Sequence, residues 1–308
     1  MARQKKCRIC KQEGFIHLRY ANLPLCKKHF ISRTESVVQS TINKFRMFSK
    51  KDRLLVAVSG GKDSLALWHI IEKLGFKADG LHIDLELGEF SKLSREISEQ
   101  FSKTHRFYLN VISVKEELGG YIDDFVKIAY EKPCSLCGTV KRYILNKFAY
   151  ENGYDVLLTG HNLDDETARL LGNLLIWDKD YVYRQYPVLP AEAKMVKKVK
   201  PLVFISRNEL LAYCDAEHIE YVKITCPHST GARSLVMVDI LDQLENRYPA
   251  TKLRFLKGFF KIRNLFESER EVNLYECHEC GMTTTSEKLC RFCRIKNRIK
   301  DKNAAKNF

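Results

Sequence analysis

The 308-residue sequence contains no apolar run that approaches the roughly 18–20 residues needed to cross a lipid bilayer. The basic start of the chain, residues 1–7, leads into no apolar stretch, so it lacks the pattern of a secretory signal. A disordered chain is also excluded, because hydrophobic residues make up 45% of the sequence against 29% charged residues. We expect a globular cytoplasmic protein with no membrane contact, built as one large domain with additions or as two domains.

Acidic residues are scarce at both ends of the chain. Residues 1–53 contain 14 Lys and Arg against 3 Asp and Glu, and residues 277–308 contain 8 against 3. Residues 54–276 carry 30 against 32, so the net charge of +14 comes from the two end segments. This distribution favours a polyanion held by the ends around separate chemistry in the middle, with two solvated basic tails as the alternative.

Cysteine is plentiful, since the chain has eleven, and most lie in C-x2-C or C-x2-H pairs. In a chain with no secretory signal, such spacing indicates metal binding rather than disulfides. Each end has a quartet made of two such pairs, enough for closed tetrahedral coordination of Zn²⁺. The quartets are Cys7, Cys10, Cys26 and His29, and Cys277, Cys280, Cys290 and Cys293. A closed site has no position for substrate, so we predict two structural zinc ions in modules that present Lys and Arg to nucleic acid.

Between the quartets, short apolar segments alternate with helical patterns, which predicts a parallel sheet with right-handed crossovers. The expected strands are residues 53–59, 78–84, 107–114 and 154–160, and the expected helices are residues 65–74, 92–105, 121–130, 137–152 and 164–176. Helices at residues 208–218, 234–248 and 252–266 indicate a helical lobe. The predicted fold class is α/β, a doubly wound parallel sheet flanked by two small zinc-binding modules. The expected domains are a zinc finger (residues 1–32), a catalytic domain with the helical lobe (33–270), and a zinc ribbon with a basic tail (271–308).

The segment Ser59-Gly-Gly-Lys-Asp-Ser64 follows the first of these strands directly and opens a helix. Two glycines allow a tight turn in which backbone N–H groups and the helix N-terminus face an anion. The segment is not a Walker A loop, because Val56 stands where that motif needs Gly and Asp63 follows Lys62. It therefore indicates a phosphate site of another kind, with a purely structural glycine turn as the alternative.

This motif resembles the PP-loop of the ATP-pyrophosphatase superfamily, whose members cut ATP between its α- and β-phosphates and leave an adenylated substrate. The resemblance implies that two flanking positions, Ala57 and Ile83, border the adenine. It implies that the phosphates are held by Ser59, Gly60, Gly61, Asp63 and Ser64.

A second polar segment, Thr159-Gly-His-Asn-Leu-Asp-Asp-Glu166, ends a later strand. Residues beyond the carboxyl ends of parallel strands face the ligand crevice, so we expect this segment, with Gly160, beside the phosphate loop. Asp164 and Asp165 could orient Mg²⁺ on the phosphates or transfer a proton. Plain helix capping is the alternative, and one role does not exclude the other.

Four further cysteines lie outside the quartets, and three of them are candidates for chemistry: Cys134 and Cys137 form a C-x2-C pair, and Cys226 lies far along the chain. Three thiolates near a nucleotide could bind an iron–sulfur cluster and leave one iron without a protein ligand, open to an exogenous sulfur atom. A rival chemistry uses Cys137 and Cys226 as a persulfide carrier and resolving thiol. The alternative without chemistry is a set of buried thiols with a chance C-x2-C spacing. We assign Cys214, in an apolar helical pattern, to the core.

Together, the motifs resemble the tRNA 2-thiouridine synthetases, most closely those that act on 5-methyluridine 54. The resemblance implies ATP, Mg²⁺, a [4Fe–4S] cluster and two Zn²⁺ as cofactors, and tRNA as substrate. Lys141 would stabilise negative charge, Asp165 would organise ATP, metal or a proton, and the cluster of Cys134, Cys137 and Cys226 would hold the sulfur. It also implies a homodimer and a ubiquitin-like sulfur carrier ending in a thiocarboxylate.

Three alternatives stay open at this point. The same motifs would serve thiolation of the wobble uridine 34. Another adenylating enzyme of the superfamily, such as a small-molecule amide synthetase, would have no need of the basic modules. A zinc-ribbon RNA-binding protein with a vestigial nucleotide fold would need no cluster.

Overall fold

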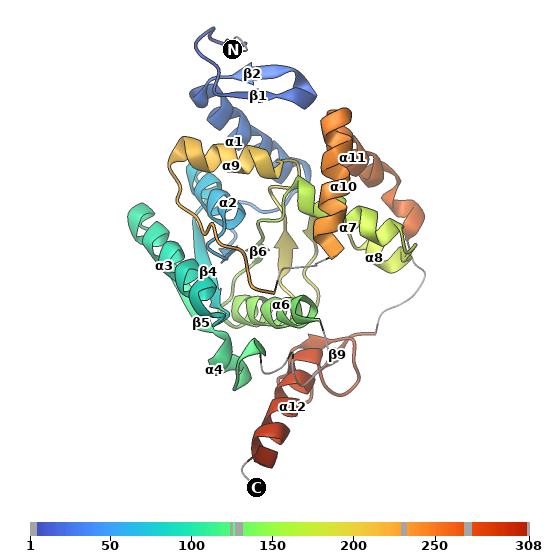
Figure 1. Cartoon of the computed structure of the whole chain (residues 1–308). Coiled ribbons are helices and arrows are strands. Elements are labelled where there is room, and N and C mark those ends of the chain that lie inside the picture. The colour runs from blue at the N-terminus through green and yellow to red at the C-terminus, as the bar shows by residue number, and fades with distance from the viewer. Residues whose placement is uncertain (1–4, 124–125, 127–131, 229–232, 268–272, 307–308) are drawn as a thin grey trace.

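The computed structural model describes residues 5–123, 126, 132–228, 233–267 and 273–306 (Figure 1). At its centre lies a six-stranded sheet with the strand order β5-β4-β3-β6-β8-β7. The strands are β3 (Leu54–Val58), β4 (Ala78–Asp84), β5 (Leu109–Ser113), β6 (Val156–Leu158), β7 (Val188–Leu189) and β8 (Lys197–Val199). All neighbouring pairs are parallel except β7 with β8, so the predicted α/β sheet is confirmed, with one antiparallel edge strand added.

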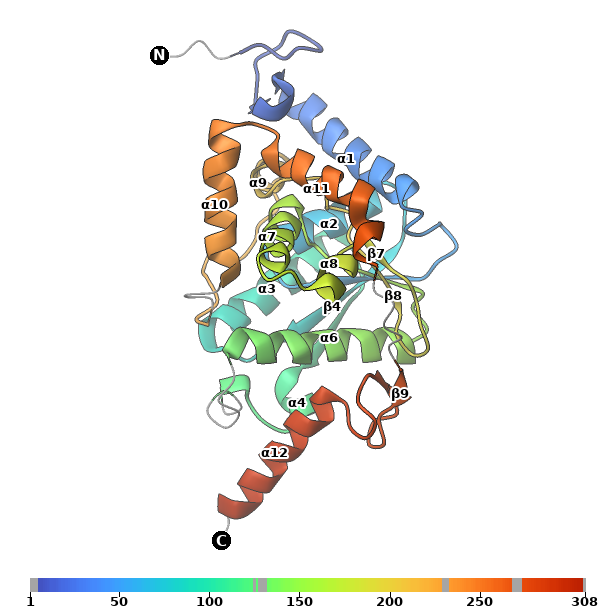
Figure 2. The ribbon, with the colours of Figure 1, turned by 90° about the vertical axis from the view of Figure 1, so that its right-hand side faces the viewer.

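Helices cover both faces of this sheet, as doubly wound connections require (Figures 1 and 2). Along β3, Leu54, Val56 and Val58 face one hydrophobic cluster, while Leu55 and Ala57 face another. The first cluster is covered by α1 (Lys27–Lys44), α2 (Lys62–Lys73), α3 (Gly88–His105) and α9 (Arg207–Glu217). The second is covered by α6 (Pro133–Glu151). The alternation explains why β3 reads as a continuous apolar run.

The order of the strands reverses between β3 and β6. From β3 the chain proceeds outward to β4 and β5, and it then crosses back to the other side of β3 to form β6. In open parallel sheets, ligands bind beyond the carboxyl ends of the strands at such a reversal. Here those ends lead into residues 59–61 and 159–162, which are the two polar segments singled out from the sequence.

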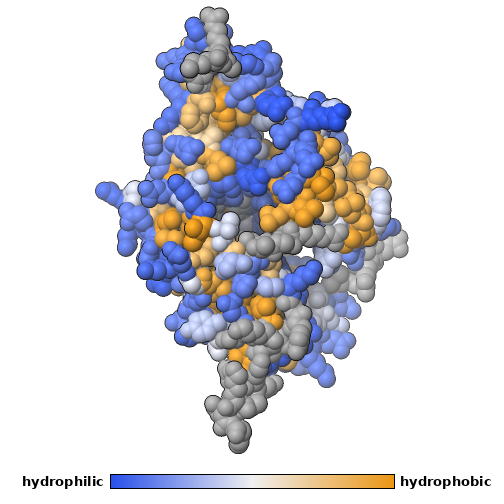
Figure 3. All heavy atoms as spheres, in the orientation of Figure 1, coloured by the Kyte–Doolittle hydropathy of each residue, from blue (hydrophilic) through white to orange (hydrophobic). Residues whose placement is uncertain are grey.

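A helical lobe packs beside the sheet. It consists of α7 (Leu163–Leu174), α8 (Lys179–Tyr183), α10 (Arg233–Arg247), α11 (Thr251–Ile262) and the 3₁₀ turn η2 (Arg263–Phe266). Apolar side chains of α7 and α11 share one cluster, which includes Leu170 and Phe259. On the outer side of α10, Val236, Ile240 and Leu244 are exposed one turn apart, in an apolar region visible in Figure 3.

Both ends of the chain form small modules joined to this body. The N-terminal module contains β1 (Ile16–Leu18), η1 (Arg19–Ala21) and β2 (Leu23–Leu25), and its apolar residues belong to the same cluster as α2. Helix α1 runs through the expected domain boundary at residues 32–33 and carries this module onto the sheet. The C-terminal module contains β9 (Tyr275–Glu276), β10 (Thr283–Thr284) and α12 (Arg291–Lys306), at the opposite end of the molecule (Figure 1).

Most of the predicted elements are present, with boundaries shifted by a few residues. The sequence pattern did not predict β7, β8, α8 or the short helix α4 (Val114–Leu118). The helix expected at residues 121–130 lies largely outside the described residues. No helix in the described part of the chain combines the length and the hydropathy that a bilayer crossing requires.

Candidate active site

The phosphate loop is held by its two serines. The backbone N–H of Ser59 donates to Ser64 Oγ at 3.1 Å, and Ser64 Oγ donates to the carbonyl of Gly61 at 2.9 Å. Helix α2 starts at Lys62, so its first backbone N–H groups point out of this turn. Free N–H groups at a helix N-terminus are a ready site for phosphate oxygens.

Gly60 has a geometric requirement that other residues cannot meet. Its φ is +73°, in the left-handed region, and a Cβ atom there would lie 2.6 Å from the backbone oxygen of Ser94 in α3. Gly61 differs, since its φ is −81° and a Cβ would lie 3.5 Å from Ser59 Oγ, an ordinary contact. The turn is therefore fixed by close approach of α3 to Gly60.

The second polar segment lies against this loop, as expected from the topology. A Cβ on Gly160 would lie 3.0 Å from the backbone of Asp63 and Ser64, so the two segments are in backbone contact. Helix α7 then starts with a capping box, in which Asn162 Oδ1 accepts from the N–H of Asp165 and the Asp165 carboxylate accepts from the N–H of Asn162.

Two neighbouring carboxylates of this segment have separate roles. Asp164 is buried, and it accepts from Lys252 Nζ at 2.5 Å and from the backbone N–H of Arg207 at 2.7 Å. It therefore anchors α9 and α11 to α7. Asp165 is reached by solvent but enclosed by protein on most sides, and this desolvation raises its pKa to about 6, with a further contribution from Asp63. Of the two, only Asp165 is free to act on a ligand.

Cys134, Cys137 and Cys226, the cysteine trio, lie in one region of the fold. Helix α6 begins with Pro133, favoured at the first helical position, so Cys134, Cys137 and Lys141 follow on one face. Cys134 Sγ donates to the carbonyl of His228, two residues beyond Cys226. Burial raises the pKa of the Cys137 thiol; Lys141 lowers it, and Cys226 and Cys134 raise it further. The thiolates thus act on each other across one small region.

This trio is wider than a site for a single ion. In the described part of the chain, only the terminal quartets have ligand atoms within 4.8 Å of one another. A four-iron cluster is ligated at its corners, so its ligands stand farther apart than those of one zinc. Cys134 is exposed and the other two thiols are partly buried, which leaves the region open to solvent on one side. The donor set fits an iron–sulfur cluster.

Two contacts connect the trio to the phosphate loop. The backbone N–H of Val222, four residues before Cys226, donates to the carbonyl of Gly60 at 2.9 Å. Burial lowers the pKa of His161, next to Gly160, to about 3, and Lys141 contributes to this shift. Lys141 therefore acts electrostatically on both Cys137 and the segment beside the phosphate loop. The segment that leads to Cys226 and the phosphate loop therefore lie against each other.

The two residues expected to border adenine lie on the same face of the sheet. Ala57 near the end of β3 belongs to the cluster under α6, and Ile83 near the end of β4 packs with Leu136 and Val140 of α6. Cys214, by contrast, is fully buried in α9, and burial raises its pKa to about 12. It belongs to the core, as predicted.

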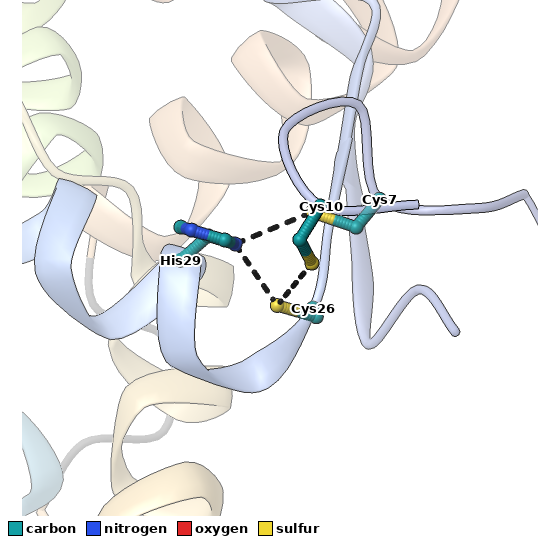
Figure 4. Close-up of side chains that lie close together, drawn as sticks. All are labelled: Cys7, Cys10, Cys26 and His29. Atoms are coloured by element: carbon teal, nitrogen blue, oxygen red, sulfur yellow. Dashed lines mark hydrogen bonds between the residues drawn. The ribbon is translucent and has the colours of Figure 1, made fainter. Parts of the chain in front are cut away.

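The N-terminal quartet is assembled for one metal ion (Figure 4). His29 Nδ1 lies 3.5 Å from Cys7 Sγ and 3.2 Å from Cys26 Sγ, and the sulfurs of Cys10 and Cys26 are 3.7 Å apart. Tetrahedral Zn²⁺ with Zn–S bonds of about 2.3 Å places its sulfurs about 3.8 Å apart, so the spacing fits zinc. Lys27 and Lys28 beside it are exposed.

The C-terminal quartet has the same geometry, with Cys280 and Cys290 sulfurs 3.8 Å apart. Its module packs directly on α6, since Phe292 stacks on Tyr143 with ring centroids 3.8 Å apart. Ile295 and Ile299 of α12 are buried in the same cluster as Val140. The module therefore supports the helix that carries Cys134, Cys137 and Lys141.

Comparison with known proteins gives the family. Residues 33–228 match the family model described as a PP-loop domain, and residues 6–31 match the N-terminal LIM domain of 2-thiouridine synthetase TtuA. The tRNA-5-methyluridine(54) 2-sulfurtransferase of Thermotoga maritima is 42% identical over 96% of this chain and 97% of its own length. The chain belongs to the PP-loop family of tRNA 2-thiouridine synthetases. The enzyme of the same name from Pyrococcus horikoshii is 41% identical over 94% of this chain and 93% of its own.

A solved structure of this family covers the whole architecture. The U34-tRNA thiolase NcsA from Methanococcus maripaludis, determined with its [4Fe–4S] cluster, is 25% identical, with a TM-score of 0.83 over 97% of both chains. The fold class predicted from the sequence is thereby confirmed. The recognition of the family is confirmed as well, by the match of both the catalytic region and the N-terminal module.

Proposed function

We propose that this protein thiolates tRNA: it adenylates the C2 oxygen of a uridine, 5-methyluridine 54 in the T-loop, and replaces that oxygen with sulfur. The observation that carries the proposal is the hydrogen-bonded approach of the Cys226 segment to the phosphate loop. The phosphate loop is hydrogen-bonded to the segment that leads to Cys226, and Lys141 acts on both Cys137 and His161. An adenylated base and a sulfur source can therefore meet without leaving the site.

In the first step, the C2 oxygen attacks the α-phosphate of ATP, and pyrophosphate leaves with the electrons of the broken P–O bond. Ser59, Gly60, Gly61, Asp63 and Ser64 hold the phosphates, as the PP-loop resemblance implies. Lys141 stabilises the developing negative charge. Asp165, with its pKa raised to about 6, accepts the proton released from uridine N3 or ligates Mg²⁺.

In the second step, a sulfur nucleophile attacks C2 and AMP leaves with the C–O electrons, so no net oxidation or reduction occurs. A [4Fe–4S] cluster on Cys134, Cys137 and Cys226 would supply an iron with an open coordination position for that sulfur. The persulfide route through Cys137 and Cys226 is the competing chemistry.

Position 54 is favoured over the wobble position by the relatives. Those that are 41–42% identical carry 5-methyluridine 54 in their names, whereas the structural neighbour at 25% identity is a U34-tRNA thiolase. Thiolation of uridine 34 is the second candidate. Transcripts in which only one of the two uridines is replaced by cytidine separate them, since only loss of the true target abolishes thiolation.

The partners follow from the same family resemblance. We propose a ubiquitin-like thiocarboxylate as the sulfur donor, a homodimer as the assembly and the cytoplasm as the location. The last agrees with a relative from Caenorhabditis elegans named cytoplasmic tRNA 2-thiolation protein 1, 29% identical over 88% of this chain. Light scattering of the purified protein tests the homodimer, and thiolation driven by a carrier in place of sulfide tests the donor.

One experiment tests the core of the proposal. Protein purified without oxygen is assayed for tRNA thiolation with ATP and sulfide, and its metals are counted. We expect brown protein with about two zinc and four iron per chain, and AMP released in step with 2-thiouridine. Zinc without iron would favour the persulfide route. ATP hydrolysis without stimulation by tRNA would instead favour a small-molecule adenylating enzyme.

A further inference from the structure

Six basic side chains belong to the elements around the cysteine trio and to the part of the sheet that lies beyond β6 from β3. Four were not singled out from the sequence as binding residues. All six come from α6, from α7, from β8 and the segment directly after it, and from the C-terminal module. The six are Lys141, Arg142, Arg169, Lys198, Lys200 and Arg291.

Hydrogen bonds and strand register bring several of these side chains near one another. Arg291 Nη2 donates to Ser135 Oγ at 3.4 Å, and Arg142 Nη2 donates to Thr139 Oγ1 at 3.5 Å, one turn farther along α6. Lys198 lies opposite Leu157 of β6, on the face of the sheet that α6 covers. Burial lowers the pKa of Lys198 to about 8, and Arg142, Lys200 and Arg169 add to the shift, in agreement with this placement.

Acidic partners are nearly absent from this group. Lys200 pairs with the buried Glu166 at 2.8 Å. Among the described residues, Arg169 and Lys198 have no hydrogen-bond or ion-pair partner, and Arg142 has one long contact of 3.5 Å to Thr139 Oγ1. Like charges held near one another repel, and binding of a polyanion would relieve that repulsion.

The position of the group identifies the anion. The strand order puts β8 beyond β6 from β3, so Lys198 and Arg169 lie to the side of the turn that would hold the ATP phosphates. The cations continue from Lys141, at the reaction centre, to Arg291 in the zinc module. Tyr181 of α8, the helix that follows α7, is 61% exposed. A basic track with an exposed aromatic ring is typical of sites for single-stranded nucleic acid.

We propose that Arg142, Arg169 and Lys198 bind backbone phosphates of the RNA strand that adjoins the target uridine, with Tyr181 as a stacking surface for a neighbouring base. This inference rests on the proposed function and places its RNA beside the cysteine trio. It explains why β8, a strand of three residues, carries cations toward α6 where the cluster under that helix is otherwise apolar. The RNA strand passes between α8 and α6, and the target uridine of this RNA reaches Lys141 and the cysteine trio.

The test is the salt dependence of tRNA binding by the full-length, metal-loaded protein. Arg169→Gln and Lys198→Gln each remove one phosphate contact, and each should flatten the slope of log affinity against log salt by about 0.7–0.9. We expect binding about 5- to 10-fold weaker at moderate salt. Lys92→Gln, on exposed α3, is the matched control and should leave the slope unchanged.

Two further measurements complete the test. ATP affinity measured without RNA should be the same in both variants and the wild type. Because each variant removes an unpaired cation, its thermal midpoint should equal or exceed that of the wild type, which separates lost binding from lost folding. Weaker ATP binding with unchanged tRNA binding would assign the group to the ATP phosphates and overturn the inference.

Equal salt slopes in the variants and the wild type would overturn it as well. The proposed function has its own point of failure. A wild-type protein that binds no tRNA would contradict that function. Wild-type and variant proteins that bind tRNA equally well would contradict only the proposed RNA contacts of Arg142, Arg169 and Lys198.

Discussion

Replacing Gly60 by alanine should destabilise the phosphate loop far more than the same change at Gly61. At residue 60, a non-glycine residue with φ near +73° costs about 1–2 kcal/mol. A Cβ atom 2.6 Å from the backbone oxygen of Ser94 must also displace α3, and such overpacking costs about 1–3 kcal/mol. Alanine recovers about 0.4–1 kcal/mol by restricting the unfolded chain. These terms give a net loss of about 1–4.5 kcal/mol for Gly60→Ala, with a centre of about 2.5 kcal/mol.

Gly61→Ala is the matched control, because residue 61 has an ordinary φ and room for a Cβ. We expect its stability to equal or slightly exceed that of the wild type. For a chain of this size, the Gly60→Ala loss corresponds to a thermal midpoint lower by about 4–6 °C. Scanning calorimetry of the metal-loaded protein measures it, and titration calorimetry should show ATP binding at least tenfold weaker.

The reasoning would be refuted by a simple result. If Gly60→Ala and Gly61→Ala melt within one degree of each other, the approach of α3 does not determine the shape of the loop. Weaker ATP binding in Gly60→Ala without a change in midpoint would also count against the close contact, because the clash with Ser94 is independent of ligand.

Three other predictions follow from the site. Cys226→Ser should abolish thiolation and reduce the visible absorption and iron content, while ATP binding stays near the wild-type level. The control Cys214→Ser, at a residue buried in α9, should keep its iron. Equal iron content in the two variants would contradict the cluster assignment. Asp165→Asn should be more stable than the wild type at pH 8, because the pKa of about 6 makes the ionised carboxylate unfavourable in the folded state. The difference should vanish below pH 4. Denaturant titrations at both pH values measure it, and a variant less stable than the wild type at pH 8 would contradict the prediction. Cys290→Ala should lower the zinc content by one per chain and lower the thermal midpoint, since Phe292 and Ile295 would lose their packing on α6. An unchanged midpoint would show that the module does not support that helix.

Several parts of the site were predictable because each is encoded in a short segment. A C-x2-C pair places two ligands on one turn, and Ser59–Ser64 forms its turn through its own glycines and hydroxyls. The three-cysteine site needed more, because Cys226 is brought to Cys137 only by the fold. Its prediction came from the family resemblance.

The sequence by itself determined the alternating strands and helices, the two zinc quartets and the phosphate loop, since apolar periodicity and ligand spacing act within a few residues. Only the tertiary structure decided that Asp164 anchors Lys252 while Asp165 is free to act on a ligand, because the two are adjacent in sequence and differ only in what lies around them. It alone also placed Lys198 beside Arg142 and Arg169. β8 has only three residues, too few to show a period, and the electrostatic interactions within this group join segments that lie far apart along the chain.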